Sequence, residues 1–223
     1  IVNGEYYINN ELSAGKKVLA EGAQGSMLDI DFGTFPFVTS SSTISAGVCT
    51  GLGVAPQKIR EVMGVTKAYC TRVGSGPFPT ELEDTIGEQL RSIGNEFGAT
   101  TGRPRRCGWI DLVALKYACM LNGVTQVVMT KADVLDHFEE LKVCTAYDIH
   151  GNTTTEVPFQ LNKLPIIPQL QSFAGWHTDT TAIKEKTNMP AAMNTYIDFF
   201  NQFVNAPVKY VSNGPGRDQI IPL

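Results

Sequence analysis

Residues 124–129 (VTQVVM) form a short, nearly continuous apolar run, and this run constrains the fold more than any other segment. Such a run is typical of a strand in a parallel sheet whose two faces are both covered by helices. The spacing of apolar residues predicts helices over residues 84–93 and 109–121, ahead of the run. Pro190 is predicted to begin a later helix, and residues 208–211 read as another strand. Alternating helices and strands predict an α/β fold.

Other segments carry weaker signals. Residues 17–21 read as a strand that runs into a glycine-containing turn. Pro56 is predicted to begin a helix that continues to Tyr69, because the apolar residues between them keep helical spacing. Residues 141–149 and 153–159 flank a His-Gly-Asn turn and resemble a β-hairpin. No internal repeat or domain boundary is evident, so we expect one structural unit.

The composition excludes several classes of protein. The 223 residues carry a formal net charge of −4, which argues against a general nucleic-acid-binding protein. No apolar run approaches the length of a membrane span, so we expect no membrane insertion. The five cysteines are scattered and include no C-x-x-C pair. This pattern is typical of reduced thiols and indicates a cytoplasmic protein without a disulfide framework or zinc site.

Residues 95–106 (NEFGATTGRPRR) have the composition of an anion-binding loop. Glycine lets the backbone approach a ligand closely, and threonine hydroxyls are hydrogen-bond donors. Arginine adds a planar fork that matches carboxylates and phosphates. The alternative is a charge-rich surface connection, but the Thr-Thr-Gly lead-in and the helix predicted to follow favour an anion site.

Residues 130–133 (TKAD) directly follow the apolar strand. A motif of this kind reads guanine in GTP-binding proteins: the aspartate accepts from the ring N–H and the exocyclic amine, and the lysine stem lies along the base. Adenine presents the opposite pattern, so one carboxylate discriminates between the two bases. The alternative is a helix start with Asp133 as its cap. The position of residues 130–133 directly after a strand favours a ligand site, because α/β sheets bind ligands at the carboxyl ends of their strands.

The phosphate-binding part of a nucleotide site has no counterpart, since the chain contains neither G-x-x-x-x-G-K-[ST] nor a strand-linked G-x-G-x-x-G. Several weaker polar candidates remain. Gln24, in a glycine-containing turn, could donate to a ligand oxygen or cap the backbone. The hydroxyls of residues 38–42 could bind phosphate or form Ser-rich turns. Asp29 and Asp31 could form a paired carboxylate or lie in an ordinary strand.

Seven segments, taken together and in order, resemble the adenylosuccinate synthetase family. They are residues 21–25 (EGAQG), 29–34 (DIDFGT), 38–41 (VTSS), 72–81 (RVGSGPFPTE), 95–106, 130–133 and 212–215 (SNGP). The resemblance runs from about residue 18 to the end of the chain. It implies part of a mixed, mainly parallel sheet with flanking helices, P-loop-NTPase-like in general character.

The resemblance also implies an activity. Members of the family are GTP-dependent ligases that use Mg²⁺ to join IMP and L-aspartate into adenylosuccinate, in the AMP branch of purine biosynthesis. The GTP γ-phosphate is first transferred to the purine 6-oxygen, and the aspartate amine then displaces that phosphate. Stabilisation of developing charge is the expected main contribution of the protein. A homodimer is expected for the full-length enzyme.

The family's binding roles can be carried onto matching positions. For IMP, the resemblance implies Gln24 near the 6-oxygen, Thr39 at the 5′-phosphate, Val73 lining the pocket and Arg103 at the ribose. The expected aspartate-binding residues are Ala99, Thr100, Thr101, Gly102, Arg103, Pro104 and Arg105. The expected GTP-binding residues are Arg105, Lys131, Ala132, Asp133, Ser212, Asn213 and Gly214.

The chain departs from the family in length, since members are roughly twice as long. The family's Gly-Asp-Glu-Gly-Lys-Gly-Lys segment, general-base aspartate, catalytic histidine, magnesium ligands and partner-subunit arginine have no match here. Residues 1–223, which begin at Ile1, are therefore expected to be the C-terminal portion of a single domain. This portion would carry no metal ligands and be inactive alone. The alternatives are a guanine-nucleotide-binding module without catalysis and a degenerate structural remnant.

Overall fold

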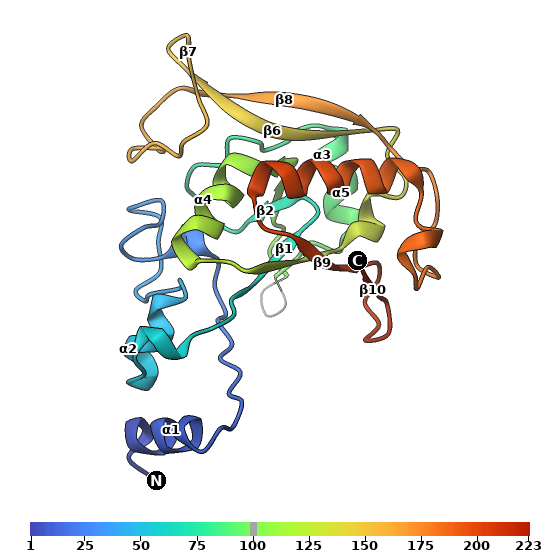
Figure 1. The fold of residues 1–223 in the computed structure, drawn as a ribbon. Coiled ribbons are helices and arrows are strands. Elements are labelled where there is room, and N and C mark those ends of the chain that lie inside the picture. Colours follow the sequence, from blue (N-terminus) through green and yellow to red (C-terminus); the bar gives the residue numbers. More distant parts are fainter. Residues whose placement is uncertain (99–101) are drawn as a thin grey trace.

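The central sheet of the molecule has the strand order β1-β5-β9-β10 in a computed structural model that describes residues 1–98 and 102–223 (Figure 1). The strands β1 (Met63–Lys67), β5 (Gln126–Thr130) and β9 (Val208–Ser212) are parallel, and β10 (Ile220–Pro222) is antiparallel to β9. Val127 and Met129 of β5 are each 1% exposed. The apolar run therefore forms a buried central strand, as predicted.

Three helices flank this sheet: α3 (Thr85–Ile93), α4 (Leu112–Asn122) and α5 (Ala191–Val204). The side chain of Asp84 caps α3 by accepting from two backbone N–H groups, and Asp111 caps α4 in the same way with one. Pro190 precedes the first turn of α5. Leu90, Leu112 and Phe200 are buried in one continuous core. The α/β prediction is confirmed.

A second sheet lies on the far side of α4 and α5 from the central sheet (Figure 1). Its long strands β6 (Glu140–Ile149) and β8 (Ile166–Ala174) are antiparallel. The short strands β4 (Ile110–Asp111) and β7 (Asn152–Thr154) also pair with β6. Helices α4 and α5 therefore lie between the two sheets, and this packing fixes the position of the central strands.

The remaining elements are short. Strands β2 (Cys70–Arg72) and β3 (Arg106–Gly108) pair antiparallel. Helices α1 (Gly4–Ser13) and α2 (Ala46–Leu52) lie beside each other, away from the two sheets (Figure 1). The 3-10 helices are η1 (Ser26–Leu28), η2 (Pro56–Lys58), η3 (Ala132–Leu135) and η4 (Lys186–Asn188).

Three predictions about elements are wrong or incomplete. Residues 17–21 contain no strand, and Pro56 begins only η2, after which the chain enters β1. Tertiary contacts explain why residues 63–67 form a strand instead of a helix. β1 pairs with β5 along its whole length, and Gly64 faces the Val124 side chain. The predicted hairpin exists, but its second strand ends at Thr154, and the main partner of β6 is β8.

No helix in the part of the chain that the structure describes is long and apolar enough to cross a membrane. All five cysteines are free.

Candidate functional site

The carboxyl ends of β1, β5 and β9 place three candidate segments at one edge of the central sheet. Lys67 ends β1 opposite Thr130 of β5, so Lys131 follows directly beside it. Ser212 ends β9, the other parallel neighbour of β5. Parallel strands necessarily bring their carboxyl ends to the same edge, which is where open α/β sheets bind ligands. The structure therefore brings the TKAD segment beside residues 212–214.

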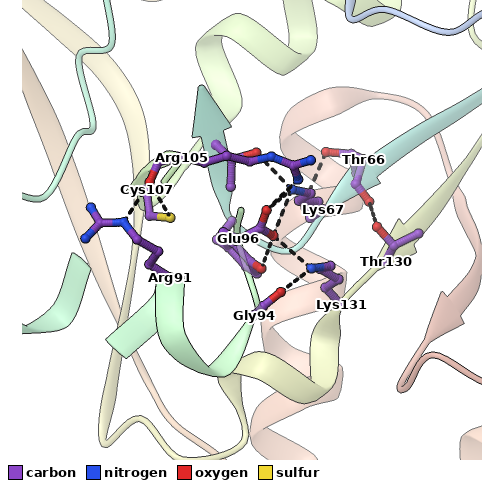
Figure 2. Close-up of polar contacts among 11 residues, drawn as sticks. Thr66, Lys67, Arg91, Gly94, Glu96, Arg105, Cys107, Thr130 and Lys131 are labelled. Carbon is purple, nitrogen blue, oxygen red and sulfur yellow. Dashed lines mark hydrogen bonds and ion pairs between the residues drawn. The ribbon is translucent and has the colours of Figure 1, made fainter. Parts of the chain in front are cut away.

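A buried carboxylate, Glu96, lies at this edge and joins segments that are far apart in the sequence (Figure 2). Lys67 Nζ lies 2.8 Å from both of its oxygens, and Lys131 Nζ lies 2.9 Å from Oε1. Arg105 Nη1 lies 2.7 Å from Oε2. The Tyr69 hydroxyl donates to Oε1 at 2.5 Å. Three cationic side chains among the described residues thus converge on one anion.

The charge balance of this cluster makes it receptive to an anion. The Glu96 side chain is 0% exposed, whereas those of Arg105 and Lys131 keep 30% and 36% of their surface exposed. Burial alone would raise the pKa of Glu96, but the hydrogen bonds from Lys67, Tyr69 and Lys131 lower it to about 2. The carboxylate is therefore ionised, and the three cations leave a net positive charge at the sheet edge.

Lys131 has a backbone geometry that turns the chain sharply at the end of β5. Its φ is 58°, and η3 follows directly. Its Nζ donates to the Gly94 carbonyl as well as to Glu96. Asp133 lies inside η3, and Lys131 occupies the cap position. The alternative interpretation of Asp133 as a helix cap is therefore wrong, because another residue stands where the cap would be.

Asp133 is half-buried, and burial is the main cause that raises the pKa of its carboxyl group. The backbone N–H of Asp133 donates to this carboxylate, and no hydrogen bond or ion pair from a side chain is found among the described residues. Ala132, by contrast, is fully buried and belongs to the core. Asp133 is thus a desolvated acceptor at the carboxyl edge of the sheet, and a ligand with two adjacent donors would satisfy it.

Residues 212–214 form a turn whose central side chain points into the protein. Asn213 is 0% exposed, and its Nδ2 donates to the carbonyls of Thr180 and, at 2.9 Å, Ile183. The Ser212 hydroxyl donates to the Gly214 carbonyl at 3.1 Å. Asn213 therefore holds the turn in place, whereas Ser212 and Gly214 remain partly exposed beside η3.

Residues 95–106, called the arginine loop below, are held at the base of the loop by backbone pairing. The Arg105 N–H donates to the Glu96 carbonyl at 2.9 Å, and the Gly98 N–H donates to the Arg103 carbonyl at 2.8 Å. Gly102 has φ of 64°, a left-handed conformation that favours glycine. Arg103 and Pro104 are exposed. Three of the expected aspartate-binding residues, Ala99, Thr100 and Thr101, lie outside the described residues.

The residues expected to bind IMP are spread over separate loops. Val73 is 54% exposed and lies in the turn after β2. Arg72 connects this turn to residues 34–37, because its Nη2 donates to the Phe37 carbonyl at 3.1 Å. The Thr39 N–H donates to the Leu28 carbonyl at 2.8 Å. Gln24 is exposed, and no hydrogen bond among the described residues joins it to the other candidates.

Comparison with known proteins identifies the family. Residues 1–221 match the family described as adenylosuccinate synthetase. The chain belongs to this family. It is 56% identical over 221 residues to the adenylosuccinate synthetase of Parabacteroides distasonis, covering 99% of this chain and 52% of that protein. The adenylosuccinate synthetase of Azobacteroides pseudotrichonymphae is also 56% identical, over 220 residues, with the same coverage.

A solved structure extends the likeness to three dimensions. The fully ligated adenylosuccinate synthetase from Plasmodium falciparum superposes with a TM-score of 0.96 at 39% identity. The match covers 100% of this chain and 54% of that one. The chain thus has the P-loop-like fold of the family, as the sequence predicted. It spans about half the length of the relatives it matches.

The adenylosuccinate synthetase resemblance pointed to most of this edge but assigned no role to Glu96, Lys67 or Tyr69. Glu96 stands inside the arginine-rich segment, where an acidic residue reads as a surface charge. The sequence did carry one signal for this cluster. Lys67 and Tyr69 have polar groups and stand at the end of a stretch that includes β1. The helix predicted from Pro56 to Tyr69 obscured it.

Asp29, one of the two carboxylates considered as a pair, has a structural role. Its buried carboxylate accepts from four backbone N–H groups, those of Asp31, Phe32, Thr43 and Ile44.

Among the described residues, no group of three or more His, Cys, Asp or Glu side chains gathers closely enough to hold a metal ion. One or two carboxylate ligands, several waters and the substrate phosphates are typical of Mg²⁺ at a nucleotide.

The low pKa of Glu96 predicts a pH-dependent contribution to stability. Its folded pKa of about 2 lies below the ordinary 4.5, so the stabilisation is present above the unfolded pKa and is lost as pH falls toward the folded pKa. We expect Glu96→Gln to lower the free energy of unfolding at neutral pH, and the difference from wild type to shrink from about pH 5 downward. Urea unfolding of both proteins over this pH range measures it; a difference that does not vary with pH would contradict it.

Proposed function

We propose that this chain is the C-terminal part of an adenylosuccinate synthetase. In this role it supplies the guanine site, the aspartate site and part of the IMP site of a GTP-dependent ligase. The enzyme transfers the GTP γ-phosphate to the 6-oxygen of IMP and releases GDP. The aspartate amine then attacks carbon 6 and displaces inorganic phosphate. The observation that carries the proposal is the sheet edge on which Arg105 and Lys131 share the buried Glu96.

The guanine site is proposed at Asp133, Lys131 and residues 212–214. The desolvated Asp133 carboxylate would accept from the ring N–H and the exocyclic amine of guanine, and the Lys131 stem would lie along the base. Adenine offers no such pair of donors, so Asp133 would be left unsatisfied; an unpaired buried group costs about 1–3 kcal/mol. Ser212 and Gly214 would close the other side of the base.

The aspartate site is proposed at the arginine loop. Arg105 keeps 30% of its side chain exposed while Glu96 fixes one of its nitrogens, so the remaining donors of the guanidinium can reach an aspartate carboxylate and a GTP phosphate. The loop residues Ala99 to Thr101, with Gly102, Arg103 and Pro104, would complete this site. Arg103 would also reach the IMP ribose.

The IMP site is proposed to include Gln24, Thr39 and Val73. Gln24 would donate to the 6-oxygen where charge develops during phosphoryl transfer, which is where a positioned donor contributes most to the rate. Thr39 would contact the 5′-phosphate, and Val73 would line the pocket.

The other catalytic parts are proposed to lie in the half of the family protein that this chain does not span. These parts are the general-base aspartate, the histidine that acts on the γ-phosphate, the magnesium ligands and the phosphate-binding loop. We further propose a cytoplasmic homodimeric enzyme, whose partner subunit contributes an arginine to IMP.

Activity assays on the isolated chain and on the full-length protein test the proposal. With IMP, L-aspartate, GTP and Mg²⁺, we expect adenylosuccinate from the full-length protein and none from residues 1–223 alone. Spectrophotometric detection of adenylosuccinate provides the readout, and circular dichroism establishes that the isolated chain is folded. Turnover by the folded chain alone would disprove its proposed incompleteness. Absence of turnover by the full-length protein would disprove the ligase.

A guanine-nucleotide-binding module is the second candidate, favoured by the half-buried Asp133 carboxylate at the sheet edge. Calorimetric titration of the isolated chain with GTP, GDP and ATP separates the two. Tight binding of GTP without any other polypeptide would support the module. Weak binding that strengthens in the full-length protein would support the ligase.

A further inference from the structure

The two proposed ligand sites meet at one side chain. Arg105, assigned to aspartate and GTP phosphate, binds Oε2 of Glu96, and Lys131, assigned to guanine, binds Oε1 (Figure 2). Both cations keep about a third of their surface exposed while the carboxylate has none. Neither cation can therefore change its position without changing the hydrogen bonding of a buried anion, and leaving such an anion short of partners is costly.

The backbone around Glu96 reinforces this connection. Lys131 Nζ also donates to the Gly94 carbonyl, two residues before Glu96. The Glu96 carbonyl accepts from the Arg105 N–H at 2.9 Å. Lys131 is thus bonded to the segment that leads into Glu96, and Arg105 is bonded to Glu96 through both backbone and side chain. Residues 94–96 therefore connect the end of β5 to the base of the arginine loop.

Lys67 and Tyr69 keep the carboxylate from turning. Lys67 bonds both oxygens and the Thr71 hydroxyl, and Tyr69 is 1% exposed. A carboxylate fixed in this way presents Oε1 to Lys131 and Oε2 to Arg105, while Lys67 bonds both oxygens. It therefore positions Arg105 and Lys131 relative to each other, not only relative to itself.

We propose that Glu96 is a positioning residue that couples Arg105 to Lys131, so that a guanine nucleotide and L-aspartate bind with positive cooperativity. The inference rests on the ligand sites of the proposed function. A guanine base that packs on the Lys131 stem orders Lys131, and through Glu96 it orders Arg105. Aspartate then meets a guanidinium that is already in place, so less conformational entropy is lost on binding. The coupling is reciprocal by thermodynamic necessity.

Binding measurements on the full-length protein test the coupling. The Kd for L-aspartate is measured calorimetrically with IMP present, with and without saturating GDP, which carries guanine but no transferable phosphate. We expect GDP to tighten aspartate binding by at least about five-fold in the wild type, the lower end of typical couplings. In Glu96→Gln we expect less than about a two-fold effect, because the neutral amide no longer holds both cations.

Asp111→Asn is the matched control. Asp111 is also a buried carboxylate that accepts from a buried tyrosine, with Tyr147 Oη 2.6 Å from its Oδ2, but it caps α4 and bonds none of the three cations. We expect this variant to lose stability and to keep the full effect of GDP on aspartate. If Glu96→Gln does not fold, Glu96→Asp replaces it: this side chain keeps the charge but is one methylene too short to reach both cations, so the GDP effect is expected to fall.

The outcomes separate the inference from the proposed function. An unchanged GDP effect in the Glu96 variants, or no GDP effect in a wild type that makes adenylosuccinate, overturns the coupling and leaves the ligase standing. An equal loss in Asp111→Asn also overturns it, because general destabilisation would then explain the result. A wild type that makes no adenylosuccinate but shows the GDP effect retains the coupling and overturns the ligase.

Discussion

Replacement of Asp133 by Asn is expected to weaken GTP binding to the full-length enzyme by about 10- to 150-fold. The proposed carboxylate accepts two hydrogen bonds from guanine, and hydrogen bonds to charged groups contribute about 1.5–3 kcal/mol each. Each 1.4 kcal/mol is about ten-fold in affinity. In the Asn variant, the amide NH₂ faces a donor of the base and one of the two bonds is lost. The loss falls in this range because the site is partly desolvated by burial.

Xanthosine triphosphate provides the test of mechanism. Xanthine carries a carbonyl where guanine carries the exocyclic amine, so the new amide of the Asp133→Asn variant can donate to it and restore the lost bond. We expect Asp133→Asn to reverse the preference of the enzyme from GTP to XTP, measured as the ratio of kcat/KM values. Asp136→Asn is the control: Asp136 is also buried, but it accepts from Trp176 Nε1 and Thr180. A control that shifts the ratio equally, or an Asp133→Asn enzyme that still prefers GTP, contradicts the guanine assignment.

The parts of the fold that could be predicted are those fixed by local pattern. The helices α3 and α5 and the strands β5 and β9 lie where apolar spacing, Pro190 and the unbroken apolar run placed them. The predicted helix after Pro56 is wrong because local spacing does not report pairing: β1 is a strand through its contact with β5, about 60 residues later in the chain. The strand β8 was also missed, because it contains Pro168 and is defined by its pairing with β6 and not by a local pattern.

The site was predictable to the extent that topology determines it. Once residues 124–129 and 208–211 are parallel neighbouring strands, the segments after them must meet at one edge. Glu96 was not predictable in this way. Its burial depends on Lys67 and Tyr69 at the end of a strand that the sequence presented as a helix. An acidic residue next to arginines is usually on the surface, and only the fold shows that it is 0% exposed.

Arg105 is expected to account for the other large effect. Arg105→Leu in the full-length enzyme removes a charge-assisted, two-pronged contact with the aspartate carboxylate, which contributes about 2–3 kcal/mol, or roughly 30- to 150-fold in the KM for aspartate. The fold should survive, because Glu96 keeps Lys67, Tyr69 and Lys131 as partners. Arg105→Lys keeps the charge but not the planar fork, so its KM should lie between those of the wild type and Arg105→Leu.

Arg91→Met is the control that separates ligand binding from local structure. Arg91 is a nearby guanidinium whose Nε donates to the Arg105 carbonyl at 2.8 Å, so it supports the loop base without carrying the proposed contact. We expect its KM for aspartate to stay within about three-fold of the wild-type value. Such a change is smaller than the change of about ten-fold that corresponds to 1.4 kcal/mol. Steady-state kinetics at saturating IMP and GTP measure all three variants. If Arg91→Met raises the KM as much as Arg105→Leu does, loop distortion explains both results. If Arg105→Leu leaves the KM unchanged, the aspartate assignment of Arg105 is wrong, and the cluster around Glu96 serves the fold alone.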